Sequence, residues 1–142
     1  MQRVLPLALT ALATFVVSTG VMAQNSNDKV IFEHLQDYME AAPFADGVIT
    51  AAQLKGLTAK PLIVDTRPAE VYAKDHIAGA INIDWRFVLS EVKQLPKDRL
   101  IVLYCDTGIL SSKAHFALRL VGYEQVKVLF NGYEGWKAST KK

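Results

Sequence analysis

The sequence predicts an α/β protein with a mostly parallel sheet and helices on both faces of that sheet. Short apolar segments typical of buried strands alternate along the chain with segments whose apolar residues recur at helical spacing. Glycine and proline mark many of the boundaries between the two kinds of segment. The 142 residues contain no internal repeat and no low-complexity linker, so we expect a single such domain.

The first elements are predicted from apolar spacing and capping patterns. Residues 29–41 carry apolar side chains close to a 3.6-residue repeat, which predicts a helix that Pro43 ends. A short strand is expected at residues 48–49. Residues 50–53 have the capping-box pattern that begins a helix, and this helix should end near Gly56.

The middle of the chain is predicted to alternate two strands with two helices. Residues 61–64 form a buried strand. Pro68 fits the first turn of a helix through about Lys74, because the missing proline N–H would have no partner there. Residues 80–83 form the next strand, and residues 85–92 are expected to be helical.

The last third has a strand, a helix and a second strand. An apolar run over residues 100–104 predicts a buried strand. Apolar residues then recur at i, i+3, i+4 and i+7 and predict a helix that ends at Gly122. The final strand is expected at residues 126–130. From Lys137 onward the chain is polar, and we expect this tail to fray.

The amino terminus has the pattern of an export signal. Arg3 precedes an apolar run over residues 4–17, and residues 21–23 supply side chains suited to a cleavage site. We therefore expect a periplasmic protein from which the signal has been removed. The alternative is an uncleaved membrane anchor, but polar residues and a proline interrupt the run short of the roughly 20 residues that a span needs.

The predicted organisation has four parts: a signal peptide at 1–23, a helical extension at 24–47, the α/β domain at 48–137 and a polar tail at 138–142. The formal charge of the whole chain is +2, and cleavage of the signal removes one positive charge with Arg3. Such a small charge gives no attraction to nucleic acid or to an anionic membrane, so we expect neither as a partner and no stable membrane insertion after processing.

Cys105 is the only cysteine of the chain and the strongest candidate for chemistry. It follows the strand at 100–104 and precedes a tight loop. Ligands of open α/β sheets bind beyond the carboxyl ends of the strands, so this thiol has the position of a nucleophile. Export strengthens the interpretation, because a lone cysteine cannot form a disulfide within its own chain in an oxidising compartment. The alternative is an inert buried thiol.

Four segments, taken in order, carry a family resemblance. They are Asp65–Arg67, Asp75–Ile83, Tyr104–Ser111 and Asn131–Trp136. Together they resemble the signature segments of the rhodanese-like sulfurtransferases, over about residues 48–136. The resemblance implies a small α/β domain around a five-stranded, mainly parallel sheet. It also implies that Cys105 is catalytic and carries a sulfane sulfur as a persulfide.

The loop after Cys105 is predicted to bind the substrate. Its residues are Asp106, Thr107, Gly108, Ile109, Leu110 and Ser111. Backbone N–H groups of the loop and the dipole of the following helix can stabilise a thiolate and its persulfide. Gly108 lets the loop turn back on itself, and Ser111 or Ser112 is expected to be the N-cap of the helix.

Other polar residues near the predicted site are given supporting roles. Asp65 and Arg67 end the neighbouring strand, where an Asp-turn and an ion pair would fix the loop. His76 is interpreted as structural and His115 as a surface residue. The three histidines and the cysteine lack metal-ligand spacing, and glycine-rich phosphate motifs are absent, so we expect no metal or cofactor.

The charge of the loop argues against thiosulfate as the natural donor. Asp106 directly follows the nucleophile, and a carboxylate facing the sulfur would repel a dianion. Ile109 and Leu110 favour a less charged molecule at the mouth of the site. Arg86 and Lys113 are the nearby cations that could compensate. The acceptor is expected to be a small thiol, a protein thiol or cyanide.

Two other functions fit part of the pattern. Certain dual-specificity phosphatases share the rhodanese fold, but they place arginine where this chain has Ser111, so the charge clamp for a phosphoryl group is missing. A non-catalytic binding or sensing module would present the loop to a protein partner, with Ile109 and Leu110 as apolar anchors. We expect an exported sulfurtransferase that moves sulfane sulfur through a persulfide on Cys105.

Overall fold

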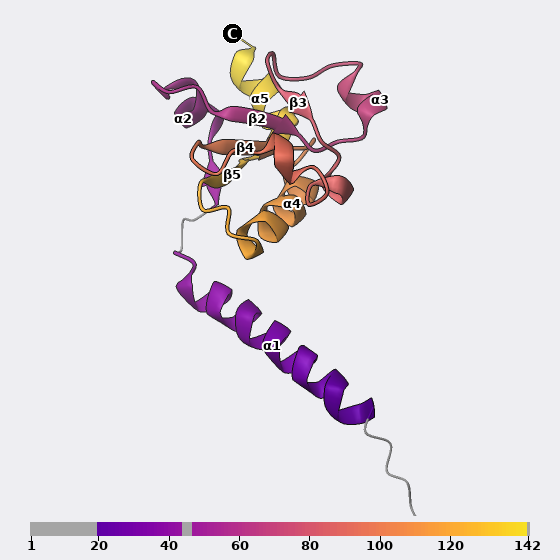
Figure 1. The fold of residues 1–142 in the computed structure, drawn as a ribbon. Helices are drawn as coiled ribbons and strands as arrows, with labels where there is room; N and C mark the ends of the chain where they lie inside the picture. The colour runs from indigo at the N-terminus through magenta and orange to yellow at the C-terminus, as the bar shows by residue number, and fades with distance from the viewer. Residues whose placement is uncertain (1–19, 44–46, 142) are drawn as a thin grey trace, which may run out of the picture.

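Five strands form one parallel sheet in the computed structural model, which describes residues 20–43 and 47–141 (Figure 1). The strands are β1 (Val48–Ile49), β2 (Leu62–Asp65), β3 (Ile81–Asn82), β4 (Ile101–Tyr104) and β5 (Val126–Leu129). Their order is β1-β5-β4-β2-β3, and every neighbouring pair is parallel. The predicted sheet is therefore confirmed, and β4, which precedes Cys105, lies at its centre.

Helices cover both faces of the sheet (Figure 1). They are α2 (Ala51–Lys55), α3 (Ala69–Tyr72), α4 (Ile109–Leu120) and α5 (Gly132–Thr140), with α1 (Gly20–Ala41) at the amino-terminal end and the short 3-10 helices η1 (Trp85–Phe87) and η2 (Val92–Gln94). Helix α4 packs on one face, and α2 and α5 pack on the other. This is the two-faced arrangement that the alternation of strands and helices predicts.

The side chains of β4 build a separate core on each face. Leu103 packs with Leu118 of α4 on one side of the sheet. Tyr104 points the other way and packs with Leu54 of α2 and Tyr133 of α5. All five side chains are buried, so the end of β4 is fixed from both sides. The loop that carries Cys105 therefore starts from a rigid point of the fold.

The prediction of one helix over residues 85–92 is wrong. Two separate 3-10 helices, η1 and η2, form in this part of the chain instead. Asp84 caps the first of them by accepting the backbone N–H of Arg86. Ser90 then donates its hydroxyl to the carbonyl of Phe87 at 2.8 Å, and the N–H of Glu91 donates to the same oxygen. A serine that bonds the backbone in this way competes with continued helical hydrogen bonding.

The predicted fraying of the polar tail is also wrong, because α5 continues to Thr140. The ammonium group of Lys55 in α2 donates to both the carbonyl and the hydroxyl of Ser139, each at 2.9 Å. The same ammonium lies 4.9 Å from the ring centroid of Trp136. The hydrogen bonds between Lys55 and Ser139, which are 84 positions apart in the sequence, hold the end of α5. Local sequence patterns give no sign of this support.

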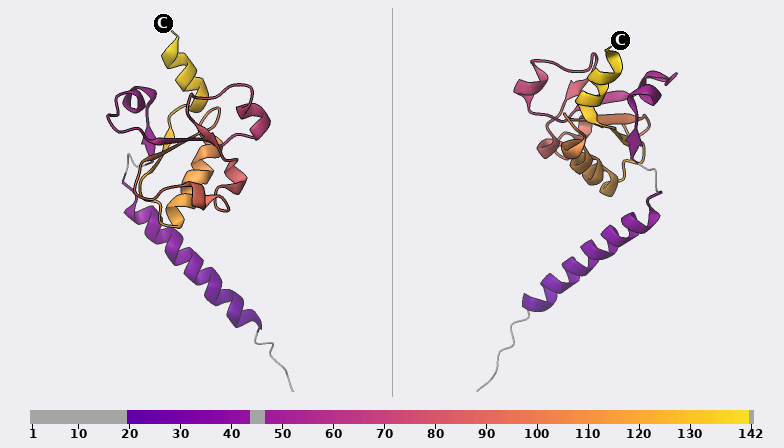
Figure 2. Two further views of the ribbon diagram at one scale, coloured as in Figure 1. Left: turned by 45° about the horizontal axis from the view of Figure 1, so that its top comes forward. Right: turned by 180° about the vertical axis from the view of Figure 1, so that it is seen from behind.

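Helix α1 runs away from the sheet as a single rod (Figure 2). It includes the predicted helix at 29–41 but begins earlier, at Gly20. Its carboxyl-terminal end meets the domain where the ring of Tyr38 packs edge-on against Phe116 of α4, with 5.2 Å between centroids. The expected signal peptide lies outside the described residues, apart from its last residues in α1. Within the described ranges, no helix has the length and apolar character needed to cross a membrane.

Candidate active site

Cys105 lies directly after β4 and is 2% exposed. Its sulfur accepts the backbone N–H of Gly108 at 3.2 Å, and the hydroxyl of Ser111 lies within hydrogen-bonding reach of it at 3.7 Å. Because Gly108 is the N-cap of α4, the sulfur also lies at the positive end of the helix dipole. The thiol is thus placed where negative charge on sulfur is stabilised.

The turn from Cys105 into α4 depends on Gly108. This residue has φ = +103°, a conformation that side chains with a Cβ rarely adopt. The expectation that Ser111 or Ser112 caps the helix is wrong, since α4 already begins at Ile109. The N-cap is Gly108, and no side chain caps the helix. The sulfur of Cys105 accepts the N–H of this N-cap residue itself.

The start of α5 holds the loop from outside. The N–H of Tyr133 donates to the carbonyl of Cys105 at 2.7 Å, and the N–H of Glu134 donates to that of Asp106 at 3.0 Å. Gly132 permits this approach, because a Cβ there would overlap the carbonyl oxygen of Cys105. Asn131, at φ = 57°, turns the chain into the helix. The sequence prediction missed this clamp, although the Asn-Gly pair is a signal of a left-handed turn.

Arg67 is the buried cation beneath the loop. Its guanidinium forms an ion pair with Asp65 at 2.6 Å, and its other branch reaches Asp106 at 2.9 Å. It lies over the rings of Tyr133 and Tyr104, at 4.6 and 5.6 Å from their centroids. The hydrogen bonds to Asp65, and then those to Asp106, raise the pKa of Arg67 despite its burial. The pair expected to fix the loop is therefore formed, and it extends to the loop itself.

The two tyrosines beside Arg67 are neutral supports. Burial raises the pKa of Tyr104 well above its ordinary value and that of Tyr133 to about 12. The hydroxyl of Tyr104 accepts the backbone N–H of Ile77 at 3.0 Å. Neither phenol is therefore suited to act as a base near neutral pH.

The predicted substrate-binding residues divide into two groups. Asp106 and Thr107 are exposed, and Gly108 is buried in the turn. Ile109, Leu110 and Ser111 form the first turn of α4 and are exposed, half-buried and buried in that order. The carboxylate of Asp106 is paired with Arg67, so the negative charge beside the nucleophile is partly compensated from below.

The other ionisable residues considered from the sequence are engaged elsewhere. Arg86 pairs with Asp84, and the ammonium of Lys113 lies 4.8 Å from the ring centroid of Trp85. His76 is exposed and stacks on a neighbouring tyrosine. The prediction that His115 is a surface residue is wrong: its side chain is buried between α4 and β1, because the chain enters β1 directly over its ring.

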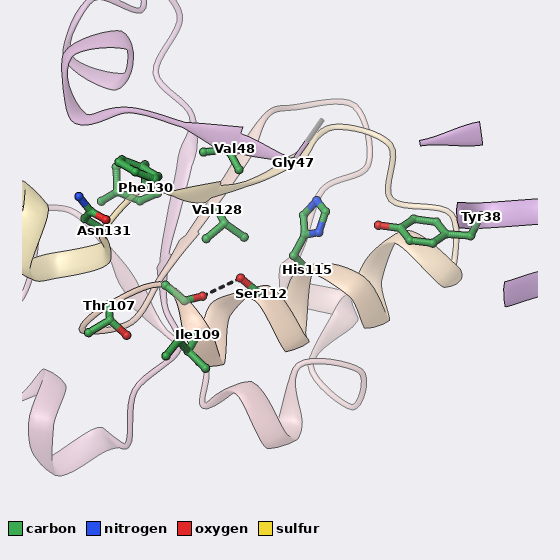
Figure 3. Close-up of a pocket in the computed structure, with 12 residues that line it drawn as sticks. Tyr38, Gly47, Val48, Thr107, Ile109, Ser112, His115, Val128, Phe130 and Asn131 are labelled. Atoms are coloured by element: carbon green, nitrogen blue, oxygen red, sulfur yellow. Dashed lines mark hydrogen bonds between the residues drawn. The ribbon is translucent and has the colours of Figure 1, made fainter. Parts of the chain in front are cut away.

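An open groove of about 430 Å³ begins at the loop (Figure 3). Thr107, Gly108 and Ile109 lie at one end of it, and Tyr38 of α1 lies at the other. The ring of His115 lies between these ends. Cys105 does not line this groove, but the loop residues that follow it do.

The comparison with protein families identifies the fold. The model of the rhodanese-like domain matches residues 50–139, which include the strand, loop and helix around Cys105. The chain belongs to the rhodanese-like domain family.

Two curated relatives of this rhodanese-like domain are sulfurtransferases. The thiosulfate sulfurtransferase GlpE of Coxiella burnetii is 30% identical over 77 residues, covering 54% of this chain and 72% of the relative. A sulfurtransferase of Allochromatium vinosum is 36% identical over 76 residues, covering 53% and 70%. These relatives support a sulfurtransferase-like function for the rhodanese-like domain.

Solved structures agree with this family assignment. A Lactobacillus plantarum protein is 30% identical, with a TM-score of 0.57 and coverage of 80% of this chain and 94% of that one. A rhodanese-like domain protein of Staphylococcus aureus is 27% identical, with a TM-score of 0.58 and coverage of 63% and 90%. The Staphylococcus aureus structure therefore supports the rhodanese-like fold of this chain.

Proposed function

We propose that the protein is an exported sulfurtransferase that carries a sulfane sulfur on Cys105 as a persulfide. The observation that carries the proposal is the position of the single thiol: it follows the central strand, accepts the N–H of Gly108 and lies at the amino-terminal end of α4. Stabilisation of negative charge on sulfur is what a thiolate nucleophile and its persulfide both require. The sulfurtransferase relatives support the same chemistry.

The proposed reaction has two displacements on sulfur. The thiolate of Cys105 attacks the outer sulfur of the donor and forms a new S–S bond. The donor's own bond to that sulfur breaks, and its electron pair departs with the leaving group, which is sulfite when the donor is thiosulfate. A thiolate or cyanide acceptor then attacks the outer sulfur of the persulfide. The electron pair of the broken S–S bond returns to Cys105 as thiolate.

The surrounding residues have separate roles in this proposal. The loop from Asp106 to Ser111 contacts the donor, and the N–H of Gly108 stabilises the sulfur of Cys105. Asp65 and Arg67 keep the loop in place through their ion pair and the contact to Asp106. No metal or cofactor takes part in either step. The partners are a small sulfur donor and a thiol, which can belong to a protein.

Intact mass measurement tests the proposed function. The purified protein is incubated with thiosulfate or with polysulfide and then weighed, with Cys105→Ser as the blank. Sulfur transfer predicts an increase of about 32 Da, one sulfur atom, that cyanide removes. A chain that never gains this mass with either donor is not a sulfurtransferase of this type.

A binding module is the second candidate, because one apolar residue of the loop is strongly exposed. The side chain of Ile109 is 66% exposed beside the groove, where a protein partner could contact it. Leu110, the other apolar anchor expected from the sequence, is half-buried and contributes less surface. The same mass measurement decides between the candidates, since a binding module gains no sulfur.

Asp106→Asn is expected to improve thiosulfate as a donor. Asparagine can still accept the hydrogen bond of Arg67, but the guanidinium charge beneath the loop is no longer compensated there. The rate constant for persulfide formation from thiosulfate should rise about three- to tenfold at low salt and less at high salt. Loading from a neutral organic trisulfide should not change. An unaltered rate with thiosulfate would mean that the charge of Asp106 does not reach the donor.

Export predicts a mature chain that begins at Gln24 in the periplasmic fraction. The basis is the apolar segment and the residues before the cleavage site, as described from the sequence. Amino-terminal sequencing of the fractionated native protein provides the measurement. An uncleaved anchor predicts Met1 in the membrane fraction instead. A chain starting at Met1 in the cytosol would contradict export.

A further inference from the structure

Two neighbouring serines in the first turn of α4 share one acceptor but differ in their relation to the nucleophile. The hydroxyl of Ser111 donates to the carbonyl of Gly108 at 2.9 Å, and that of Ser112 donates to the same oxygen at 2.7 Å (Figure 3 shows the second bond). Ser111 is fully buried and also lies 3.7 Å from the sulfur of Cys105. Ser112 is exposed, and its hydroxyl bonds the carbonyl alone.

The carbonyl of Gly108 has more donors than it needs. Besides the two hydroxyls, the backbone N–H of Ser112 donates to it at 2.9 Å. A carbonyl oxygen has two lone pairs, so three donors exceed its capacity. The hydroxyl of Ser111 has a single proton and can give it either to the carbonyl or to the sulfur. Turning that proton to the sulfur leaves the carbonyl satisfied by Ser112.

We propose that Ser111 is a catalytic residue whose hydroxyl turns from the carbonyl of Gly108 to the sulfur of Cys105 when that sulfur is negatively charged. A hydrogen bond to a charged acceptor is stronger than one to a neutral carbonyl, which favours the turn. The charge is on this sulfur in the free thiolate and reappears there when an acceptor takes the outer sulfur of the persulfide. The hydrogen bond from Ser111 should therefore accelerate the second displacement most, because the thiolate of Cys105 is the leaving group of that step.

The catalytic part of this proposal rests on the proposed sulfur transfer, but its first test does not. Thiolate formation is followed by absorbance near about 240 nm as a function of pH, on the full chain without any donor. The chain has one cysteine, so subtracting the curve of Cys105→Ser leaves the titration of Cys105 alone. Ser111→Ala is compared with Ser112→Ala, which removes an equivalent hydroxyl from the same carbonyl.

Ser111→Ala is expected to move the titration midpoint upward by about one pH unit, as loss of one charge-assisted hydrogen bond predicts. Ser112→Ala should leave the midpoint in place. Equal shifts in both variants, or no shift in Ser111→Ala, would overturn the proposal. Ser111→Thr keeps a hydroxyl at this position and should leave the midpoint near that of the wild type, so a shift in this variant as large as the one expected for Ser111→Ala would also overturn the proposal.

Single-turnover kinetics test the catalytic part separately. In Ser111→Ala, discharge of the persulfide to cyanide should slow about tenfold, in proportion to the shift of the titration midpoint. Loading from the donor should slow less. If the midpoint shifts but discharge does not slow, Ser111 contacts the sulfur without acting in catalysis. If no persulfide forms in the wild-type protein, sulfur transfer fails while the titration result still stands.

Discussion

Cys105→Ser should abolish sulfur transfer and leave the fold intact. A serine hydroxyl is a far weaker nucleophile than a thiolate at neutral pH and cannot hold sulfur as a persulfide. The rate of thiocyanate formation from a sulfane sulfur donor and cyanide measures the effect. We expect less than about a tenth of the wild-type rate, which corresponds to at least about 1.4 kcal/mol of lost transition-state stabilisation.

The structure explains why this variant should still fold. The serine oxygen occupies the place of the sulfur and can accept the N–H of Gly108 that now reaches the sulfur at 3.2 Å. The thermal unfolding midpoint therefore serves as the control and should change by only a few degrees. A folded variant that retains more than about a tenth of the activity would contradict a mechanism through Cys105.

Arg67→Met should produce the largest loss of stability. The guanidinium is almost completely buried and pairs with Asp65, whose side chain has no exposed surface. Methionine would fill much of the volume but would leave a buried carboxylate without its cation, which costs about 3–5 kcal/mol. For a domain of this size we expect the unfolding midpoint to fall by about 10 °C or more. Activity should fall as well, because Asp106 loses its contact beneath the loop.

The matched control for Arg67→Met is Arg86→Met. Arg86 forms an ion pair of the same 2.6 Å length with Asp84, also two residues away, but its own side chain is 57% exposed. Its removal should leave the unfolding midpoint nearly unchanged. Equal effects of the two substitutions would show that burial does not set the strength of the Arg67 pair.

The pH dependence of the Arg67 effect follows from the direction of its pKa shift. The bonds to Asp65 and Asp106 raise this pKa above its ordinary value. The stability that Arg67 contributes through its charge is therefore fully present below the ordinary arginine value and is lost only at more alkaline pH. The charge of Arg67 itself therefore adds no pH dependence to the unfolding free energy of the wild-type protein between about pH 6 and 9.

Local patterns in the sequence were sufficient for the sheet and for the placement of the thiol. The apolar run at 100–104 marks a strand buried on both sides, and Cys105 follows it as expected. The pairing of Asp65 with Arg67 was also accessible, because the two residues are neighbours at the end of one strand. Such features depend on residues close in sequence, which periodicity and turn chemistry describe well.

The features that the sequence did not reveal depend on contacts between distant residues. Arg67 reaches Asp106 across 39 positions, and Lys55 reaches Ser139 across 84. The start of α4 was misplaced because its N-cap is Gly108 in a left-handed conformation, without a side-chain cap, and not a serine. Nothing in the spacing of Ser111 and Ser112 indicated that one of them faces the nucleophile and the other faces solvent.

The hydrogen bonds from the first turn of α5 to the loop determine when the site can form during synthesis of the chain. A ribosome synthesises Cys105 well before Tyr133 and Glu134, whose N–H groups hold the carbonyls at the start of the loop. During synthesis the cysteine therefore exists for a time without its finished surroundings. Helix α5 must be synthesised before the loop can take its final shape. The thiol of Cys105 is therefore present in the growing chain before the complete site can form around it.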